Sequence, residues 1–358
     1  MRFVSSALDR VVFPLLSRSG FLRSTVKGGP AVVTYHGVFP AGYKPRNPAL
    51  DGNLVHSESL RQQLQLLKSR YHIVSPEDFM HWLDGKAEIP PRSVLLTCDD
   101  ALQNCLTDMV PILREFDLQC IFFATGASVE QVPSLLWYEE LYLMLLDAST
   151  PFAIQLADAS IDVHGAGSCD IHRCWWHLVE RLSQFDQDSR RIFLSNIRAQ
   201  LKLPGNWKDR YVQNSALSAR FLTLDLRGLE QLIAAGMTVG AHSLSHPVLA
   251  KAPAEIAQAE IVGCRSSLES ALGRPVWAFG YPFGTPETVT DREFAFAEQA
   301  GFQCAFTNVG GGFGSRFRRF AVPRVHVTED MSVSKFEAHL SGFYRLLRER
   351  LLGEREAA

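Results

Sequence analysis

The sequence lacks an excess of charge of either sign. Among its 358 residues, 36 Lys and Arg stand against 38 Asp and Glu, so the formal net charge is −2. Proteins that bind nucleic acid usually carry a clear basic excess, so we expect no nucleic-acid partner. A neutral polymer or a small molecule suits this balance better. The remaining composition, 46% hydrophobic and 21% charged, is ordinary for a globular protein.

The cysteines form no pattern that is typical of a metal site or of a disulfide framework. The chain has seven cysteines, an odd number, and none of them forms a C-x-x-C pair. The sequence therefore predicts neither a disulfide framework nor a zinc site made of thiolates. It favours a reducing compartment.

Residues 1–30 contain no apolar run that would make a signal peptide or a membrane span, because Asp9 and Arg10 interrupt it. Apolar residues recur there at roughly helical spacing and arginines flank them: Val4, Leu8, Val11, Val12 and Leu15, with Arg2, Arg10, Arg18 and Arg23. We expect an amphipathic segment that packs on the protein's own surface. Peripheral contact with a membrane is the alternative. The expected location is cytoplasmic, with the surface of the inner membrane as a variant of it.

The central part of the chain alternates strand and helix patterns. Short apolar strands are predicted at residues 31–38, 93–100, 119–125, 237–243, 276–282, 303–308 and 320–327. Helical patterns of about ten to twenty residues separate most of them, which predicts βαβ units and a parallel α/β sheet or barrel. Residues 137–220 break this alternation and read as a mostly helical insertion.

We therefore divide the chain into an N-terminal segment (1–30), a barrel (31–136 and 221–330), the insertion (137–220) and a C-terminal helix (331–358). The histidines and cysteines of the insertion match no metal-binding template, and we expect them to be packing and surface residues: His164, Cys169, His172, Cys174 and His177. Trp175 and Trp176 could stack on sugar rings, although such a pair is more often half buried in a core.

Two polar motifs follow apolar strands. Asp99 and Asp100 end the predicted strand at 93–100, which contains the apolar run 94–96. His242 lies at the end of the strand at 237–243, and His246 stands four residues further on. Active sites of parallel α/β folds gather at the carboxyl ends of strands. Two imidazoles and one carboxylate are a common ligand set for a catalytic divalent metal, and a second carboxylate nearby can act as a base. The sequence thus predicts a metal site in which one Asp is a ligand and the other a base.

A third segment, "WAFGYPFGTP", also follows a strand. Pro282 and Gly284 predict a tight turn that directs backbone N–H groups, and the rings of Tyr281 and Phe283, toward the same edge. The N–H of Phe283 is our candidate for stabilising an oxyanion.

The three motifs "TCDDA", "HSLSH" and "GYPFG" resemble, in this order, the first three motifs of the polysaccharide deacetylases (carbohydrate esterase family 4, the NodB-homology domain). In that family they read T-F-D-D-G, H-[ST]-x-x-H and R-x-P-Y-G or close variants. The resemblance covers roughly residues 30–136 and 221–328. It implies a distorted (β/α) barrel that uses zinc or a similar divalent metal to remove N-acetyl groups from N-acetylhexosamine residues of glycans.

Position by position, the resemblance implies that Asp99 is the general base and that Asp100, His242 and His246 are the metal ligands. Phe283 then supplies the backbone N–H for the oxyanion. The last motif of the family places a histidine after a strand as general acid; His326 is the candidate, and His36, after the first strand, is its competitor or a substrate contact.

Three positions depart from the family pattern. Cys98 replaces the Phe of the first motif, and Ala101 replaces its Gly. Gly280 lies where the third motif often has an arginine that orients the base. Arg324, on a different strand, is our candidate for that guanidinium, and we group it with Tyr281 and His36 among the residues expected to bind substrate or line the site.

The function expected from these motifs is metal-dependent deacetylation of an N-acetylated sugar in a polysaccharide or a lipid-linked glycan. Two alternatives remain at this stage. A related hydrolase could cleave another amide, such as a cyclic ureide, with the same site. The other alternative is a non-catalytic protein that binds glycans or acts as a scaffold, built on a barrel that has lost its activity.

Overall fold

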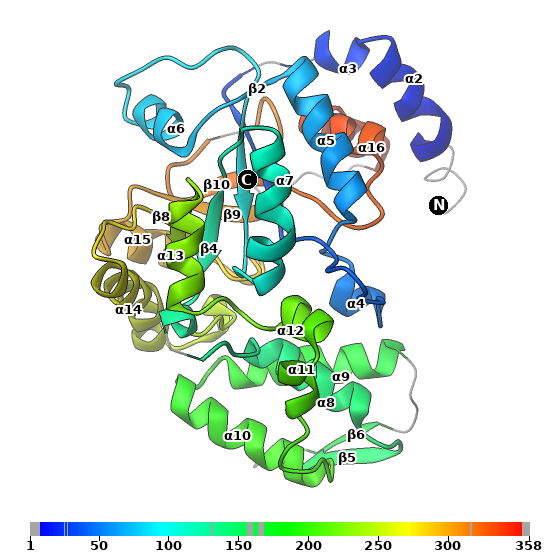
Figure 1. Ribbon diagram of the computed structural model, residues 1–358, viewed down its shortest axis with the longest axis vertical. Coiled ribbons are helices and arrows are strands. Elements are labelled where there is room, and N and C mark those ends of the chain that lie inside the picture. The colour runs from blue at the N-terminus through cyan, green and yellow to red at the C-terminus, as the bar shows by residue number, and fades with distance from the viewer. Residues whose placement is uncertain are drawn as a thin grey trace.

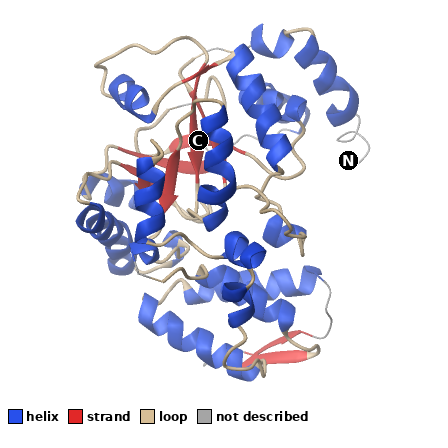
Figure 2. Ribbon diagram, in the orientation of Figure 1, coloured by secondary structure: helices blue, strands red, loops and turns tan. Residues whose placement is uncertain are grey.

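The computed structural model describes residues 8–24, 26, 28–129, 132–155, 160–163, 168–315 and 317–352. Arg2 and Val4 of the expected N-terminal amphipathic segment lie outside these residues, as does His164 of the insertion; the side chain of Cys169 is likewise not described. Figures 1 and 2 show the strands enclosed by helices in one part of the molecule, with a separate helical layer beneath them.

The centre of the fold is a parallel barrel. Its strands are β1 (Ala31–Tyr35), β2 (His72–Ile73), β3 (Ser93–Cys98), β4 (Ile121–Ala124), β7 (Thr238–Ala241), β8 (Ala278–Gly280), β9 (Cys304–Gly310) and β10 (Val322–His326). The order is β1-β10-β9-β8-β7-β4-β3-β2, and β1 also pairs with β3 along its whole length, which closes the barrel. The short β2 joins the first residues of β3. The predicted (β/α) barrel is confirmed.

Both faces of the barrel strands are buried, which explains why their sequences are apolar runs without alternation. Side chains such as Leu95, Phe123 and Phe306 fill the barrel interior. Their neighbours Leu96, Phe122 and others face the surrounding helices. These helices are α4 (Pro48–Asp51), α5 (Ser57–Arg70), α6 (Pro76–Leu83), α7 (Val110–Glu115) after the π-helical turn η2 (Cys105–Met109), α13 (Leu226–Ala234), α14 (Ala254–Leu272) and α15 (Asp291–Gln299).

The insertion lies between β4 and β7 and has a hydrophobic core of its own. After η3 (Gly126–Val129), which precedes it, the insertion consists mainly of α8 (Trp137–Asp147), α9 (Ser168–Leu182), α10 (Gln187–Gln200), α11 (Asp209–Gln213) and α12 (Ser215–Phe221). It also contains an antiparallel hairpin of β5 (Phe152–Gln155) and β6 (Ser160–Val163), which the sequence analysis did not predict. In Figure 1 these elements form the layer below the barrel.

The two ends of the described chain pack against each other. The N-terminal segment forms η1 (Leu8–Val12), α2 (Phe13–Arg18) and α3 (Phe21–Ser24). Phe13 and Leu22 are fully buried against Ala338 of α16 (Val333–Leu340). The segment therefore packs on the protein's own surface, as the favoured interpretation predicted. Residues 331–352 form two helices rather than the single one expected, because the chain turns at Gly342 (φ +75°) before α17 (Phe343–Leu352).

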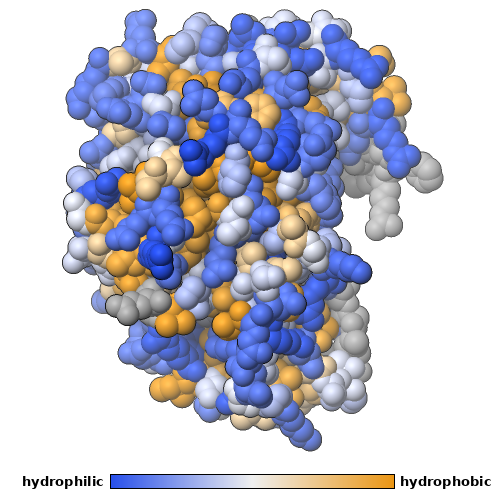
Figure 3. Space-filling model, in the orientation of Figure 1, coloured by the Kyte–Doolittle hydropathy of each residue, from blue (hydrophilic) through white to orange (hydrophobic). Residues whose placement is uncertain are grey.

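The visible face of the molecule is mostly hydrophilic, with apolar side chains showing between polar ones (Figure 3). Among the described residues, no helix combines the length and apolar character that crossing a membrane requires.

Candidate active site

The predicted site residues meet at the carboxyl edge of the barrel. His36 follows β1, Asp99 and Asp100 follow β3, His242 follows β7, and His326 ends β10. All of these except Asp99 line one cavity at this edge. The barrel thus brings together residues that lie up to 290 positions apart in the sequence.

The backbone at this edge is held in uncommon conformations. Asp100, Ala101, His246 and Phe283 all have positive φ, between +46° and +69°. Such left-handed conformations are rare for non-glycine residues and cluster at functional sites. The value at Ala101, +46°, gives a physical reason for the glycine that related motifs carry at this position.

Asp100, His242 and His246 form the cluster of potential metal ligands that the sequence predicted. The Oδ1 atom of Asp100 lies 3.3 Å from Nε2 of His246 and 3.7 Å from Nε2 of His242. Ligand atoms about 2.1 Å from a tetrahedral zinc ion are about 3.4 Å apart, so these separations suit such an ion. No other such cluster occurs among the residues that the structure describes.

The hydrogen bonds of the cluster also fit a cation. Nδ1 of His242 donates to the carbonyl oxygen of Gly280 at 2.7 Å, because a carbonyl can only accept. Burial lowers the pKa of His242 to about 4, so its Nε2 carries a lone pair and faces another lone pair on Asp100. Oδ1 of Asp100 is buried without a hydrogen-bond partner in the described chain. Two facing lone pairs repel unless a positive centre lies between them, and this donor set fits a divalent metal.

Asp99 is paired with the arginine proposed from the sequence. Nη1 and Nη2 of Arg324 donate to Oδ1 and Oδ2 of Asp99, both at 2.7 Å. Asp99 is 1% exposed and Arg324 fully buried. Burial alone would raise the pKa of Asp99, but Arg324 and the nearby His242 and His36 outweigh it and hold the pKa at about 2. Asp99 is therefore an ionised carboxylate in a fixed orientation. Arg324 contacts the base and does not line the cavity, so its expected role in substrate binding is replaced by one in positioning.

Gly280 cannot carry the arginine of the third motif in this barrel. A Cβ atom built there would lie 2.9 Å from the Phe123 ring and 3.2 Å from Nδ1 of His242. Phe123 fills the barrel interior at this level, and the Arg324 guanidinium lies over its ring at 5.6 Å. The position of the guanidinium has thus moved from β8 to β10.

Asn308, at the end of β9, is a residue that the sequence analysis missed. Its Oδ1 accepts from Nη2 of Arg324 at 2.8 Å, and its Nδ2 donates to the carbonyl of Phe283 at 3.0 Å. It therefore joins the arginine that holds Asp99 to the turn that carries the candidate oxyanion donor. The N–H of Phe283 has no acceptor within the described part of the chain. Its place as the last residue of the strand predicted at 303–308 was the signal that could have identified Asn308.

His36 and His326, the two candidates for the general acid, lie together. Their ring centroids are 4.8 Å apart, and Nε2 of His36 is 3.8 Å from Oδ2 of Asp99. Burial lowers the pKa of His326 to about 3, and its Nε2 is without a hydrogen bond in the described chain. Both rings line the cavity, so both can reach a bound substrate.

The expectation that Tyr281 contacts substrate is wrong. Tyr281 is fully buried, packs against Phe279 and Phe294, and donates its hydroxyl to the carbonyl of Phe320. Alternation along an extended chain would put residues 281 and 283 on the same side, but the left-handed conformation of Phe283 (φ +59°) turns the chain there, so Tyr281 packs in the core while Phe283 lines the cavity.

The insertion covers the barrel edge and supplies part of the cavity wall. Tyr138 places its hydroxyl 3.4 Å from Oδ2 of Asp100. Trp175 is buried and Trp176 half-buried, and both line the cavity, which measures about 260 Å³. Arg220 lines it too and bonds Glu139 and Asp51, each at 2.9 Å.

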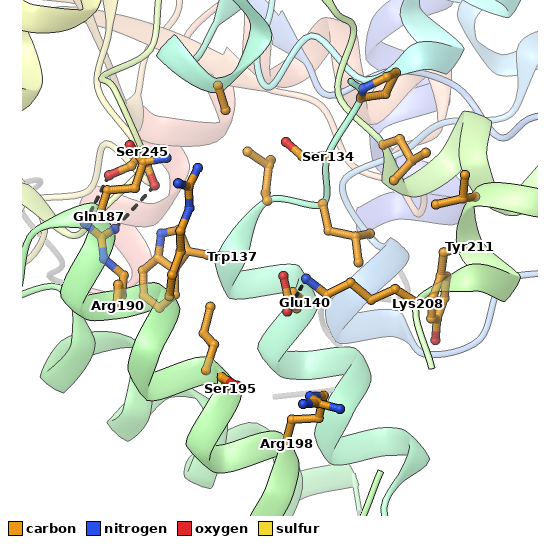
Figure 4. Close-up of a pocket in the computed structure, with 18 of the residues that line it drawn as sticks. Ser134, Trp137, Glu140, Gln187, Arg190, Ser195, Arg198, Lys208, Tyr211 and Ser245 are labelled. Atoms are coloured by element: carbon orange, nitrogen blue, oxygen red, sulfur yellow. Dashed lines mark hydrogen bonds and ion pairs between the residues drawn. The ribbon is translucent and has the colours of Figure 1, made fainter. Parts of the chain in front are cut away.

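A second, larger cavity of about 570 Å³ lies within the insertion, behind the loop that carries His246 (Figure 4). Trp137 of α8 lines this larger cavity and donates its indole N–H to the carbonyl oxygen of His246 at 3.0 Å. Arg190 of α10 stacks on Trp137 and bonds the Ser245 hydroxyl at 3.0 Å. The insertion thus supports the metal-ligand loop from behind.

The fold and site together define a closed (β/α) barrel with a candidate divalent-metal site at its carboxyl edge. Residues 197–305 match the family model described as "Polysaccharide deacetylase", a range that contains His242, His246 and Phe283. This part of the chain is therefore similar to the polysaccharide deacetylases.

Solved structures with the same fold cover most of the chain. The Streptococcus pyogenes deacetylase PplD, in complex with acetate, is 17% identical with a TM-score of 0.54 and covers 87% of this chain and 97% of its own. IcaB from Ammonifex degensii is 16% identical with a TM-score of 0.54, covering 88% and 98%. A de-N-acetylase from Aggregatibacter actinomycetemcomitans is 14% identical with a TM-score of 0.51, covering 87% and 99%. No curated protein matches this chain in sequence.

Proposed function

We propose that this chain is a metal-dependent hydrolase that removes the N-acetyl group from an N-acetylhexosamine of a polysaccharide or a lipid-linked glycan. The observation that supports this most directly is one arrangement at the barrel edge. The Asp100, His242 and His246 cluster lies beside Asp99, whose carboxylate Arg324 holds ionised and oriented. The matched family model supplies the reaction class, and the deacetylase and the de-N-acetylase among the structural neighbours are consistent with it.

Asp100, His242 and His246 would hold the cation, and zinc suits two imidazoles and one carboxylate best. When bound, such a cation polarises the acetamide carbonyl and lowers the pKa of an adjacent water.

The chain's own residues account for the proton transfers. Asp99 accepts the proton of the attacking water, since each of its oxygens keeps a lone pair besides the one that Arg324 occupies. Water adds to the carbonyl carbon, and the N–H of Phe283 donates to the oxyanion that develops. The C–N bond then breaks, and a histidine protonates the departing amine. The products are acetate and the free amino sugar.

The identity of the proton donor is tested by comparing His326→Ala with His36→Ala. We expect His326→Ala to lower kcat by at least about tenfold, because general acids typically contribute that much or more. Metal content and binding of substrate should stay close to those of the wild type. If His36→Ala has the larger effect and His326→Ala less than tenfold, His36 is the acid.

The reaction is tested by measuring acetate release from N-acetylhexosamine oligomers and from a lipid-linked N-acetyl sugar, with zinc-loaded protein. Asp99→Asn is the matched variant, since it keeps the shape of the base and leaves the three ligands intact. We expect release by the wild type, a loss of at least about a hundredfold in Asp99→Asn, and one metal per chain in both.

Other outcomes separate the alternatives. One metal per chain without acetate release from any substrate would contradict the sugar substrate and favour another amide. Absence of both metal and release would contradict the enzyme and favour a scaffold or glycan-binding protein.

A further inference from the structure

The cavity over the metal-ligand cluster is closed on the side of the insertion. Tyr138 of α8 and Trp176 of α9 pack against Phe283, with ring centroids 5.3 and 5.5 Å apart. Trp175 donates its indole N–H to the backbone of Tyr138 at 2.7 Å, which fixes the two helices together. These aromatic rings stand over the end of the barrel, where a bare barrel edge would leave an open groove.

A second wall closes the cavity between the insertion and the loop after β1. Ala49, Leu50, Asn53 and Leu54 line this side. Arg220 ties the loop to the insertion, because it donates to Oδ1 of Asp51 at 2.9 Å and to the carbonyl of Leu50 at 2.6 Å. This ion pair is almost fully buried, so the wall is a fixed part of the fold.

The cavity is small. At about 260 Å³ it lies at or below the lower end of the usual range for ligand sites, about 300–1,000 Å³. It has room for one sugar ring with its acetamide group, whereas a chain bound through an internal residue needs an exit on two sides.

Two polar atoms of this wall have no partner. Oε2 of Glu139 and Nη1 of Arg220 are buried without a hydrogen bond in the described chain, although both residues line the cavity. Buried polar groups are nearly always paired, and each unpaired one is costly. Neighbouring hydroxyls of a sugar supply the missing partners, since one donates to the carboxylate and the other accepts from the guanidinium.

We propose that the insertion turns the site into an end-on pocket for a single terminal N-acetylhexosamine, with Glu139 and Arg220 binding ring hydroxyls and Trp176 and Tyr138 contacting the ring. The enzyme then acts on the last sugar of a chain or on one sugar attached to a lipid, and not on internal residues. This inference rests on the proposed function.

The binding test does not depend on catalysis. It uses zinc-loaded Asp99→Asn protein, calorimetry, and two probes: the methyl glycoside of N-acetylglucosamine and its β-1,4 hexamer. We expect the two dissociation constants to agree within about threefold, because one sugar fills the pocket. A hexamer that binds more than about tenfold tighter would reveal an extended groove and overturn the proposal, as would the absence of saturable binding by either probe.

Glu139→Gln tests the polar wall. It keeps the size of the side chain and its bond to Arg220, and we expect it to weaken binding of the monosaccharide about tenfold, as for the loss of a hydrogen bond to a charged group. Trp176→Ala, which removes a half-buried ring from the wall, should weaken it by a similar factor. Arg198→Ala, in the larger cavity of Figure 4, is the control and should change nothing. Loss of binding in Arg198→Ala alone would place the sugar in the larger cavity and contradict the proposal.

Products from active protein distinguish the sources of the sugar. With oligomers of two to six sugars, we expect one acetate per chain whatever the length, and an equal or faster rate with a lipid-linked single sugar. Acetate that rises with chain length overturns end-on binding while leaving the proposed function intact. Absence of acetate from every substrate contradicts the proposed function. The binding test alone then shows whether the pocket holds a single sugar.

Discussion

Arg324 shows how one buried side chain can be replaced from a different strand. Its guanidinium bonds both oxygens of Asp99 and also Thr34, Asn308 and the carbonyl of Thr307. The two bonds to Asp99 orient the base, the other three hold the guanidinium in place, and the positive charge offsets the desolvation of a carboxylate that is 1% exposed. The chemistry requires a guanidinium beside Asp99, and any strand that reaches this place can carry it.

Arg324→Lys is therefore expected to damage catalysis although it keeps the charge. An ammonium group cannot bond both carboxylate oxygens in the planar geometry of a guanidinium, so Asp99 loses its fixed orientation. We expect kcat to fall roughly 10- to 100-fold, with metal content unchanged, in steady-state kinetics. Arg319→Lys is the matched control, because Arg319 pairs with Asp84 at the surface. A kcat within twofold of the wild type in Arg324→Lys would contradict this role.

Glu139 makes the stability of the protein depend on pH. Burial raises its pKa from 4.5 to about 7, and the single guanidinium of Arg220 is shared with Asp51. A raised pKa in the folded state means that the stabilisation is complete below pH 4.5 and is lost as the pH rises through about 7.

The Gln variant at this position cannot ionise and escapes that loss. Relative to the wild type, Glu139→Gln should therefore gain unfolding free energy between pH 5 and pH 8, by at most about 3 kcal/mol. Urea denaturation of both proteins at the two pH values measures the difference. A difference between the two proteins that is the same at pH 5 and pH 8 would contradict the raised pKa.

At the scale of elements, the strands that carry the site were predictable and several connections were not. β3, β7 and β10 are apolar runs that end in polar residues, and burial on both faces leaves a clear pattern in the sequence. β2 has two residues, and β5 and β6 are short strands of mixed polarity, so no periodicity distinguishes them. The glycine after the α16 helix is one among 25 in the chain, which hides the turn that splits the C-terminal helix.

Helix α8 donates one hydrogen bond to the loop that carries His246, from the indole N–H of Trp137. Trp137→Phe keeps an aromatic ring in the wall of the larger cavity but loses the donor to His246. We expect zinc affinity to fall about tenfold, as for other groups that orient ligands from outside, in a competition assay with a chelator. Trp207→Phe is the matched control, because the Trp207 indole N–H has no acceptor among the described residues. Equal affinities in the two variants would show that α8 does not orient the loop.

At the scale of the whole molecule, the N-terminal segment leaves apolar side chains exposed after it has docked. Val11, Leu15 and Phe21 are 55%, 61% and 45% exposed, although Phe13 and Leu22 of the same segment are fully buried. Arg10 and Arg18 are exposed beside them. Apolar side chains flanked by cations favour the surface of an anionic membrane.

We therefore expect the protein to sediment with vesicles that contain anionic lipid and not with neutral ones. The double variant Val11→Ser and Leu15→Ser should reduce the bound fraction at least about fivefold while thermal unfolding stays unchanged, since both side chains are more than half exposed. Val262→Ser, an exposed apolar residue on α14, is the control. Equal sedimentation of wild type and double variant would contradict peripheral membrane contact.

The sequence by itself determined the barrel and the residues of the candidate metal-ligand cluster. Apolar runs specify strands, and polar residues directly after them must meet at one edge, because parallel strands in a barrel all end on the same side. The sequence also suggested Arg324 as the partner of Asp99. Only the tertiary structure decided that Gly280 has no room for that arginine, that Tyr281 faces the core, and that Asn308 links Arg324 to Phe283. Only the tertiary structure decided, too, that the insertion closes over the site. These facts depend on which side chains meet across distant strands and helices, and such meetings leave no period or spacing along the chain.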